Sequence, residues 1–147
     1  MVYKILSVII MSILPIAELR GAIPLGLGLG LDPMVVIPLA IFFNALVFFP
    51  VFFGLSAIKD TILYRSKLVQ RQLDRIHLKR GTVDKYGYLG LLLLVAIPLP
   101  FTGAYTGAML AWLLGLDWKK SFLSITGGVV VAGLIVSSIS LGVINFF

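Results

Sequence analysis

The chain has 147 residues, of which 60% are hydrophobic and 12% are charged, and its net charge is +6. A soluble domain usually carries about a quarter charged residues, so this chain lacks the charge to cover a water-facing surface. It has no cysteine, one histidine and six acidic residues, so we expect no disulfide, no metal site, no cofactor and no enzymatic activity. We therefore predict a single all-α integral membrane domain over residues 1–147.

The first element is an interrupted apolar segment, residues 1–31. It is too long for one upright membrane helix and too short for two, because about 20 residues cross the hydrocarbon core. Proline removes a backbone donor and clashes with the preceding turn, and the residues expected to shape the interruption are Pro15, Gly21 and Pro24. We therefore predict a re-entrant hairpin, in which two half-length helices meet in a loop at bilayer depth. Its start resembles a signal peptide, but the same kind of segment recurs later, so we expect it in the mature protein.

Residues 34–57 form an apolar run that is long enough to cross the bilayer once. Residues 58–85 then form a basic connector, which holds eight of the twelve Lys and Arg residues. Basic segments beside membrane spans lie on the cytoplasmic side, so we expect this connector to be cytoplasmic and not to bind nucleic acid. Its apolar residues recur at helical spacing, which predicts an amphipathic helix on the lipid head groups that ends at Gly81. These residues are Ile62, Val69, Leu73 and Ile76, and we expect the neighbouring His77 to be solvated.

The second half repeats this order. Residues 86–116 form another interrupted apolar segment, and residues 121–147 form a second full span. The residues that predict a second re-entrant hairpin, and that we expect to shape its tip, are Pro98, Pro100, Gly103 and Gly107.

Residues 13–32 align with residues 98–117, which indicates an internal repeat. The informative matches are Pro15 with Pro100, Gly30 with Gly115, and Asp32 with Asp117. We therefore predict two copies of one unit, a hairpin followed by a span, in residues 1–57 and 86–147.

Charge placement predicts the sidedness of the two hairpins. If residues 86–116 enter and leave on one side, Lys119 and Lys120 are cytoplasmic, as the positive-inside rule favours. The same scheme places the N-terminus and Asp32 outside a multi-pass protein of the plasma membrane. The hairpins then form an inverted repeat whose tips meet near the midplane, where transporters commonly place their sites.

Glu18 and Arg20 are the only ionisable pair expected inside the membrane. Charges at that depth usually mark a substrate pathway or a proton relay, although the pair could instead be structural and pin the hairpin tip. The hydroxyl groups of the opposing tip could bind a polar head group or satisfy freed backbone groups, and they belong to Thr102, Tyr105 and Thr106. Asn44, in the first span, is either a contact between helices or a site residue.

The hairpin interpretation has an electrostatic consequence. Each return arm begins near the midplane, so its helix N-terminus directs about half a positive charge at the junction. Arg20 adds a full charge. Such a site favours an anionic head group such as phosphate, with Glu18 available to take up a proton. The alternative is a lone Glu18 that faces a hydrophobic cation.

Two strings resemble a known family. The run from Leu14 to Pro24 (LPIAELRGAIP) and the run from Ile97 to Gly103 (IPLPFTG) are similar to the small multidrug export protein family, over nearly the whole chain. That family is itself similar to the DedA membrane proteins. The resemblance implies paired re-entrant hairpins and proton-coupled movement of lipid-carrier phosphates or phospholipids. Glu18 matches the acidic residue of a DedA first hairpin, whereas the second hairpin has Leu94, Val95 and Thr102 where DedA proteins place arginines.

Three functions follow from these observations. The first is a small transporter or lipid flippase for an anionic amphipathic substrate, in which Glu18 is linked to the proton, Arg20 contacts the anion, and the hydroxyls of the second tip form a polar lining. The second is a proton-coupled exporter of lipophilic cations that uses Glu18 alone. The third is a non-transporting membrane scaffold. The expected partners are membrane lipids, the substrate and a second copy of the chain in a homodimer.

Overall fold

A computed structural model of the chain describes residues 1–58, 71, 80–98 and 103–146. The described residues form α-helices and no β-strand, which confirms the predicted all-α class. The helices are α1 (Val2–Ile13), α2 (Glu18–Gly28), α3 (Pro33–Leu46), α4 (Phe48–Ala57), α7 (Arg80–Ala96), α8 (Ala104–Leu113) and α9 (Trp118–Phe146).

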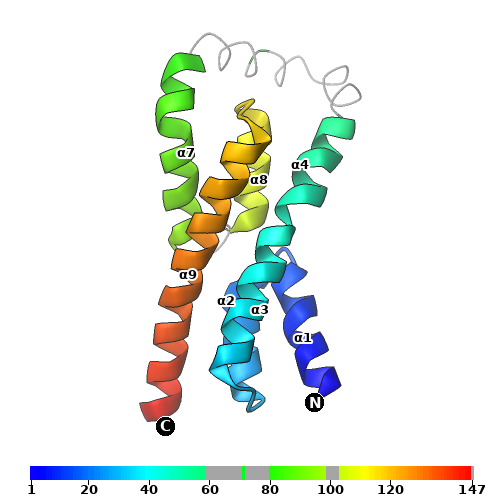
Figure 1. Cartoon of the computed structure of the whole chain (residues 1–147), viewed down its shortest axis with the longest axis vertical. Helices are drawn as coiled ribbons and strands as arrows, with labels where there is room; N and C mark the ends of the chain where they lie inside the picture. The colour runs from blue at the N-terminus through cyan, green and yellow to red at the C-terminus, as the bar shows by residue number, and fades with distance from the viewer. Residues whose placement is uncertain (59–70, 72–79, 99–102, 147) are drawn as a thin grey trace.

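Figure 1 shows long elements, which run the length of the molecule, and short helices, which occupy one half of it. α3 with α4, and α9, each run along the length of the molecule, whereas α1 and α2 occupy one half and α7 and α8 the other. Both chain termini lie at one end of the molecule, and α4 ends and α7 begins at the opposite end. Each pair of short helices therefore turns back at about mid-length.

The two long elements are the candidate membrane spans. Pro33–Ala57 has 25 residues and Trp118–Phe146 has 29, and both are apolar enough to cross a membrane. At 1.5 Å per residue they are about 38 and 44 Å long, which exceeds a hydrocarbon core of about 30 Å. Their outward side chains are also apolar, as Phe42, Leu134 and Ile139 illustrate. Such a surface suits lipid and does not suit water.

The first span was expected to be unbroken, but it is interrupted at Val47, between α3 and α4. Pro50 explains the interruption, because proline has no N–H to donate to the carbonyl of Leu46 and its ring clashes with that carbonyl. The neighbouring hydrogen bonds are long, with 3.4 Å between the nitrogen of Val51 and the carbonyl oxygen of Val47.

The break between α1 and α2 is confined to residues 14–17. Leu14 precedes Pro15 and adopts an extended conformation (φ −65°, ψ 135°), as the proline ring requires of the residue before it. The prediction that Gly21 and Pro24 belong to this break is wrong, because both lie inside α2. One proline removes a single helical hydrogen bond, and a membrane helix tolerates that loss when neighbouring helices satisfy the freed group.

Equivalent turns join α2 to α3 and α8 to α9. Gly30 and Gly115 have φ of +79° and +67°, a left-handed conformation that glycine adopts without strain. At both turns the glycine N–H bonds to the carbonyl three residues earlier, and the next N–H bonds to the carbonyl five residues earlier. These are two Schellman motifs, so the residues that the alignment paired do share one backbone geometry.

In the second half of the chain, the helices α7 and α8 begin at other residues than predicted. α7 begins at Arg80, so Gly81 lies within this helix and does not end a connector helix. A glycine inside a helix costs about 1 kcal/mol relative to alanine, which is too little to stop a helix that continues into an apolar segment. Gly107, expected in the tip, lies in α8, whereas Gly103 immediately precedes it. Pro98 follows α7.

Several predicted residues lie outside the described part of the chain. They are Pro100 and Thr102 of the second tip, and Ile62, Val69, Leu73, Ile76 and His77 of the connector.

Small residues bring α7, α8 and α9 close together. A Cβ atom on Gly128 of α9 would lie 2.7 Å from the Cβ of Val95 and 2.8 Å from the carbonyl oxygen of Leu92, both in α7. A Cβ on Gly107 of α8 would lie 2.8 Å from a methyl group of Val95. Close backbone approach of this kind is how helices associate in lipid, and it fixes the helices around the point where the hairpins meet.

Candidate functional site

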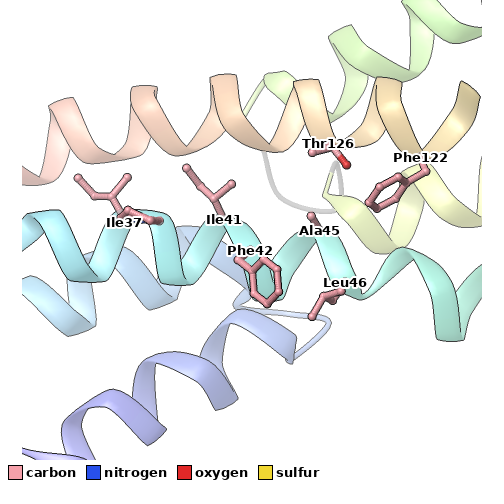
Figure 2. A pocket seen from close by; sticks show the side chains of 8 residues that line it. Ile37, Ile41, Phe42, Ala45, Leu46, Phe122 and Thr126 are labelled. Carbon is pink, nitrogen blue, oxygen red and sulfur yellow. The ribbon is translucent and has the colours of Figure 1, made fainter. Parts of the chain in front are cut away.

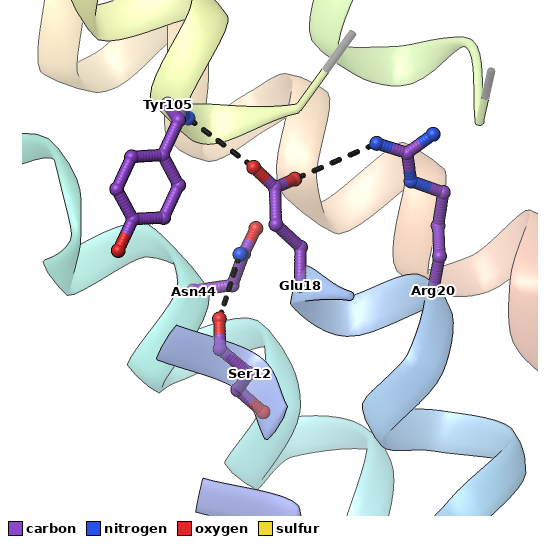
Figure 3. A network of polar contacts seen from close by, with 5 residues as sticks. All are labelled: Ser12, Glu18, Arg20, Asn44 and Tyr105. Atoms are coloured by element: carbon purple, nitrogen blue, oxygen red, sulfur yellow. Dashed lines mark hydrogen bonds and ion pairs between the residues drawn. The ribbon is translucent and has the colours of Figure 1, made fainter. Parts of the chain in front are cut away.

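Glu18 lies at the first position of α2, where the helix pair α1 and α2 meets α8 (Figure 3). Only 3% of its surface is exposed. Its φ is +50°, in the left-handed region that side chains other than glycine rarely occupy. Such strain persists only where the surroundings enforce it, and it is common at functional sites.

The Glu18 carboxylate is held by the opposing hairpin. Its Oε1 accepts a hydrogen bond from the backbone N–H of Tyr105 at 3.4 Å. Tyr105 is the second residue of α8, so the carboxylate occupies the N-terminal end of that helix, where unpaired N–H groups and the helix dipole favour a negative charge.

Gly103 provides the space for this contact. A Cβ atom built on Gly103 would lie 1.4 Å from Oε2 of Glu18. No other amino acid could occupy this position without displacing the carboxylate. A residue expected to shape the loop therefore has a second role, which is to admit the acidic side chain of the other hairpin.

Arg20 lies on the opposite side of the carboxylate (Figure 3). Its Nη2 is 3.8 Å from Oε2 of Glu18, and its side chain is 20% exposed. The separation is longer than a hydrogen bond. Within the described part of the chain, the polar contact of the Arg20 side chain is this long ion pair with Glu18, and its guanidinium carries five N–H donors.

Two side chains satisfy the carbonyl groups at the end of α1. Nδ2 of the buried Asn44, from α3, donates to the carbonyl of Ser12 at 3.0 Å, and the hydroxyl of Tyr105 donates to the carbonyl of Ile13. The last four carbonyls of a helix lack partners within it, so these contacts cap α1 with side chains from α3 and α8. Asn44 therefore forms a contact between helices, and Tyr105 joins the two hairpins.

Four of the predicted site residues lie close together. The structure brings together Glu18, Arg20, Tyr105 and Asn44, as Figure 3 shows. Thr106 follows Tyr105 in the first turn of α8.

Two spaces adjoin Arg20. A small space of about 10 Å³ is bounded by Glu18, Arg20, Asn44 and Pro98, among others, and it has room for about one water molecule. An open pocket of about 230 Å³ is also lined by Arg20 and Pro98. Arg20 therefore lines both the small space beside the buried carboxylate and the open pocket.

The open pocket includes residues that the sequence did not single out. Beside Arg20, Pro24 and Pro98 it is lined by three residues of α9, which are Val136, Ile139 and Ser140. Ser140 was passed over because it lies in a long apolar span. The signal that could have identified it is the presence of a polar residue at that depth.

A second, largely apolar groove lies between α3 and α9 (Figure 2). Its volume is about 420 Å³, which is within the range of small-molecule sites. Thr126 contributes the one hydroxyl of its lining, and the lining residues are Ile37, Pro38, Ile41, Phe42, Ala45, Leu46, Phe122 and Thr126. The groove has no charged group, and it does not include Glu18 or Arg20.

Comparison with protein families gives one match. A family described as "Putative small multi-drug export protein" matches residues 18–135, which extend from Glu18 at the start of α2 into α9. No curated protein and no solved structure matches the chain. The match covers most of the chain and includes Glu18, Arg20, α7 and α8, and the described part of the chain has two candidate membrane spans that are long and apolar enough to cross a bilayer. The chain therefore belongs to the putative small multi-drug export protein family, a family of membrane proteins.

Proposed function

We propose that the chain is a small transporter that moves an anionic amphipathic molecule across the bilayer, with the junction of the two hairpins as its site. The observation that carries this proposal is the buried Glu18 carboxylate, which lies between the N-terminus of α8 and Arg20. A buried ionisable group between membrane helices usually belongs to a substrate or proton pathway. The export description of the family also supports a transporter.

The architecture that we propose is an inverted repeat, in which each half supplies a re-entrant hairpin and a span. Three observations support it. The halves share the turns at Gly30 and Gly115, each half contains a pair of helices that turns back at about mid-length, and the pairs approach from opposite ends (Figure 1). Inverted repeats allow alternating access, because one half can rock against the other around a site at their junction.

The charges at the junction favour an anion. The N-terminus of α8 contributes about half a positive charge and Arg20 a full one, which Glu18 opposes when it is ionised. The groups that surround the carboxylate are the guanidinium of Arg20, the backbone N–H of Tyr105 and the amide side chain of Asn44. A proton on Glu18 makes the site positive, so an anion binds, and loss of the proton releases it. We propose a lipid-linked phosphate or a phospholipid as the substrate.

The rival function is proton-coupled export of lipophilic cations. The family description and the apolar groove of Figure 2 favour it, because a groove of this size could hold a drug-sized molecule. The position of Arg20 opposes it, since a cation that approaches Glu18 from the open pocket meets the guanidinium first.

Ligand-induced stabilisation of the purified protein separates these functions. A long-chain alkyl phosphate and a quaternary ammonium of equal chain length are compared in neutral detergent at two pH values. A ligand that binds only the folded form stabilises it, by about 2.7 kcal/mol at 100 times its Kd. We expect the phosphate to raise the melting temperature more at the lower pH, because a proton on Glu18 makes the site positive. Arg20→Ala should abolish the effect, and Glu18→Gln should keep the binding but remove its pH dependence.

Two results would contradict the proposal. Stabilisation by the ammonium alone, increasing as the pH rises, would favour the cation exporter. Full pH-dependent binding by Glu18→Gln would remove Glu18 from the coupling.

A further inference from the structure

The open pocket beside Arg20 combines a cation, a hydroxyl group and an apolar wall. Arg20 and Pro24 come from α2, Pro98 follows α7, and α9 contributes Val136, Ile139 and Ser140. The pocket has a volume of about 230 Å³ and includes no acidic residue in its lining. Its two polar side chains are both able to donate hydrogen bonds.

Ser140 is one of three serines of α9, with Ser121 and Ser124, that form no hydrogen bond to the preceding turn in the described part of the chain, and of these three it is the one that lines the pocket. Ser7, Ser12, Ser56, Ser137 and Ser138 each donate to the carbonyl four residues earlier. Ser140 is 8% exposed, and its hydroxyl oxygen is not among the fully buried side-chain atoms that lack a partner, so it is accessible from the pocket that it lines. A ligand in the pocket could therefore accept a hydrogen bond from this hydroxyl.

The pocket also borders an apolar strip on the outside of α9. Ile139 lines the pocket and is 59% exposed, and Ile135 and Val143, four residues before and after it, are exposed as well. Residues spaced by four lie on one face of a helix, so the strip runs past the pocket along the surface that faces lipid. An amphiphile could place its head group in the pocket and its hydrocarbon chain on this strip.

We propose that this pocket binds the phosphate head group of an amphiphile that enters from the lipid. The guanidinium of Arg20 pairs with two phosphate oxygens, the geometry for which arginine is suited, and the hydroxyl of Ser140 donates to a third. The hydrocarbon chain lies along Ile135, Ile139 and Val143. The proposal rests on the transport function above, and it names the head group, the entry side and Ser140 as an additional binding residue.

Equilibrium binding to the full chain in neutral detergent tests this proposal without a transport assay. The probes are dodecyl phosphate, inorganic phosphate and dodecyltrimethylammonium. We expect dodecyl phosphate to bind about tenfold more weakly to Ser140→Ala than to the unmodified chain, the usual loss for one hydrogen bond to a charged group. Ser140→Thr keeps the hydroxyl and should bind as the unmodified chain does. Ser138→Ala is the matched control, because Ser138 is exposed and its hydroxyl is occupied by Leu134.

Each other outcome has a defined meaning. Equal binding of dodecyl phosphate to Ser140→Ala and to the unmodified chain would overturn the pocket and leave the transport proposal standing. Inorganic phosphate binding as tightly as dodecyl phosphate would overturn entry from lipid along α9. Binding of the ammonium probe alone would overturn the anionic substrate itself, and with it the proposed function.

Discussion

At the scale of single residues, the position of the Glu18 carboxylate depends on what surrounds it. A left-handed backbone, an N–H group from α8, a nearby guanidinium and the missing side chain of Gly103 all act on this one group. The Gly103 constraint is steric, because a Cβ atom at this position would overlap the carboxylate. The geometry at the junction is therefore sensitive to the addition of a single carbon atom at Gly103.

Gly103→Ala tests this arrangement. The new Cβ would lie 1.4 Å from Oε2 of Glu18, so the carboxylate must leave the N-terminus of α8, and we expect a loss of about 1–3 kcal/mol in the free energy of unfolding, as is typical of overpacking. Chemical denaturation in detergent measures the change. Gly90→Ala is the control, because a Cβ there meets nothing within 4 Å.

A double-mutant cycle identifies the cause. If the clash with the carboxylate is responsible, Gly103→Ala should have little effect once Glu18 has been replaced by alanine. An equal loss in both backgrounds would show that the glycine is needed for another reason.

Residue-level prediction from the sequence depends on local signals. Glu18 and Arg20 stand two positions apart in an apolar segment, so their chemistry is visible without a fold. The partners of Asn44 and Tyr105 are the carbonyls of Ser12 and Ile13, which lie far away in the sequence. These pairings depend on how the helices pack, and no residue pattern encodes that packing.

At the scale of elements, the ends of the helices explain most of the architecture. Pro15 ends α1, Pro50 interrupts the first span, and glycine in the left-handed conformation ends α2 and α8. Proline acts by removing a donor and glycine by reversing the chain. Proline and glycine do not interrupt the helices everywhere, since Pro24 and Gly107 lie within α2 and α8. For this reason the sequence located the first break but overestimated its length.

The equivalence of the two turns yields a second stability test. Gly30→Ala and Gly115→Ala force alanine into a left-handed conformation, and we expect each to lower the free energy of unfolding by about 1–2 kcal/mol. Gly28→Ala is the control, because it lies inside α2 with open space around it and should be neutral or slightly stabilising. A large loss at one turn and none at the other would argue against two equivalent units.

At the scale of the whole molecule, the two ends differ in charge. Lys119 and Lys120 begin α9 at the end where α4 finishes and α7 starts, and these two helices flank the basic connector (Figure 1). In the predicted topology, Lys4 is the cation on the outer side. Its Nζ donates to the carbonyl of Leu29 at 2.8 Å, just beyond the C-terminus of α2, where the helix dipole favours a positive charge. Its position therefore has a local structural cause and does not contradict the positive-inside rule.

Sidedness can be measured directly because the chain has no cysteine of its own. Single cysteines are introduced as Gln70→Cys, Lys119→Cys and Asp32→Cys, and intact cells are treated with a membrane-impermeant thiol reagent. We expect Asp32→Cys to react in intact cells, and the other two to react only after the membrane is opened, because the basic end should face the cytoplasm. Reaction of Lys119→Cys with the impermeant reagent while Gln70→Cys stays protected would mean that residues 86–116 cross the membrane once. The second hairpin would then not be re-entrant, and the junction of Glu18 with α8 could not lie between two hairpins that enter from opposite faces.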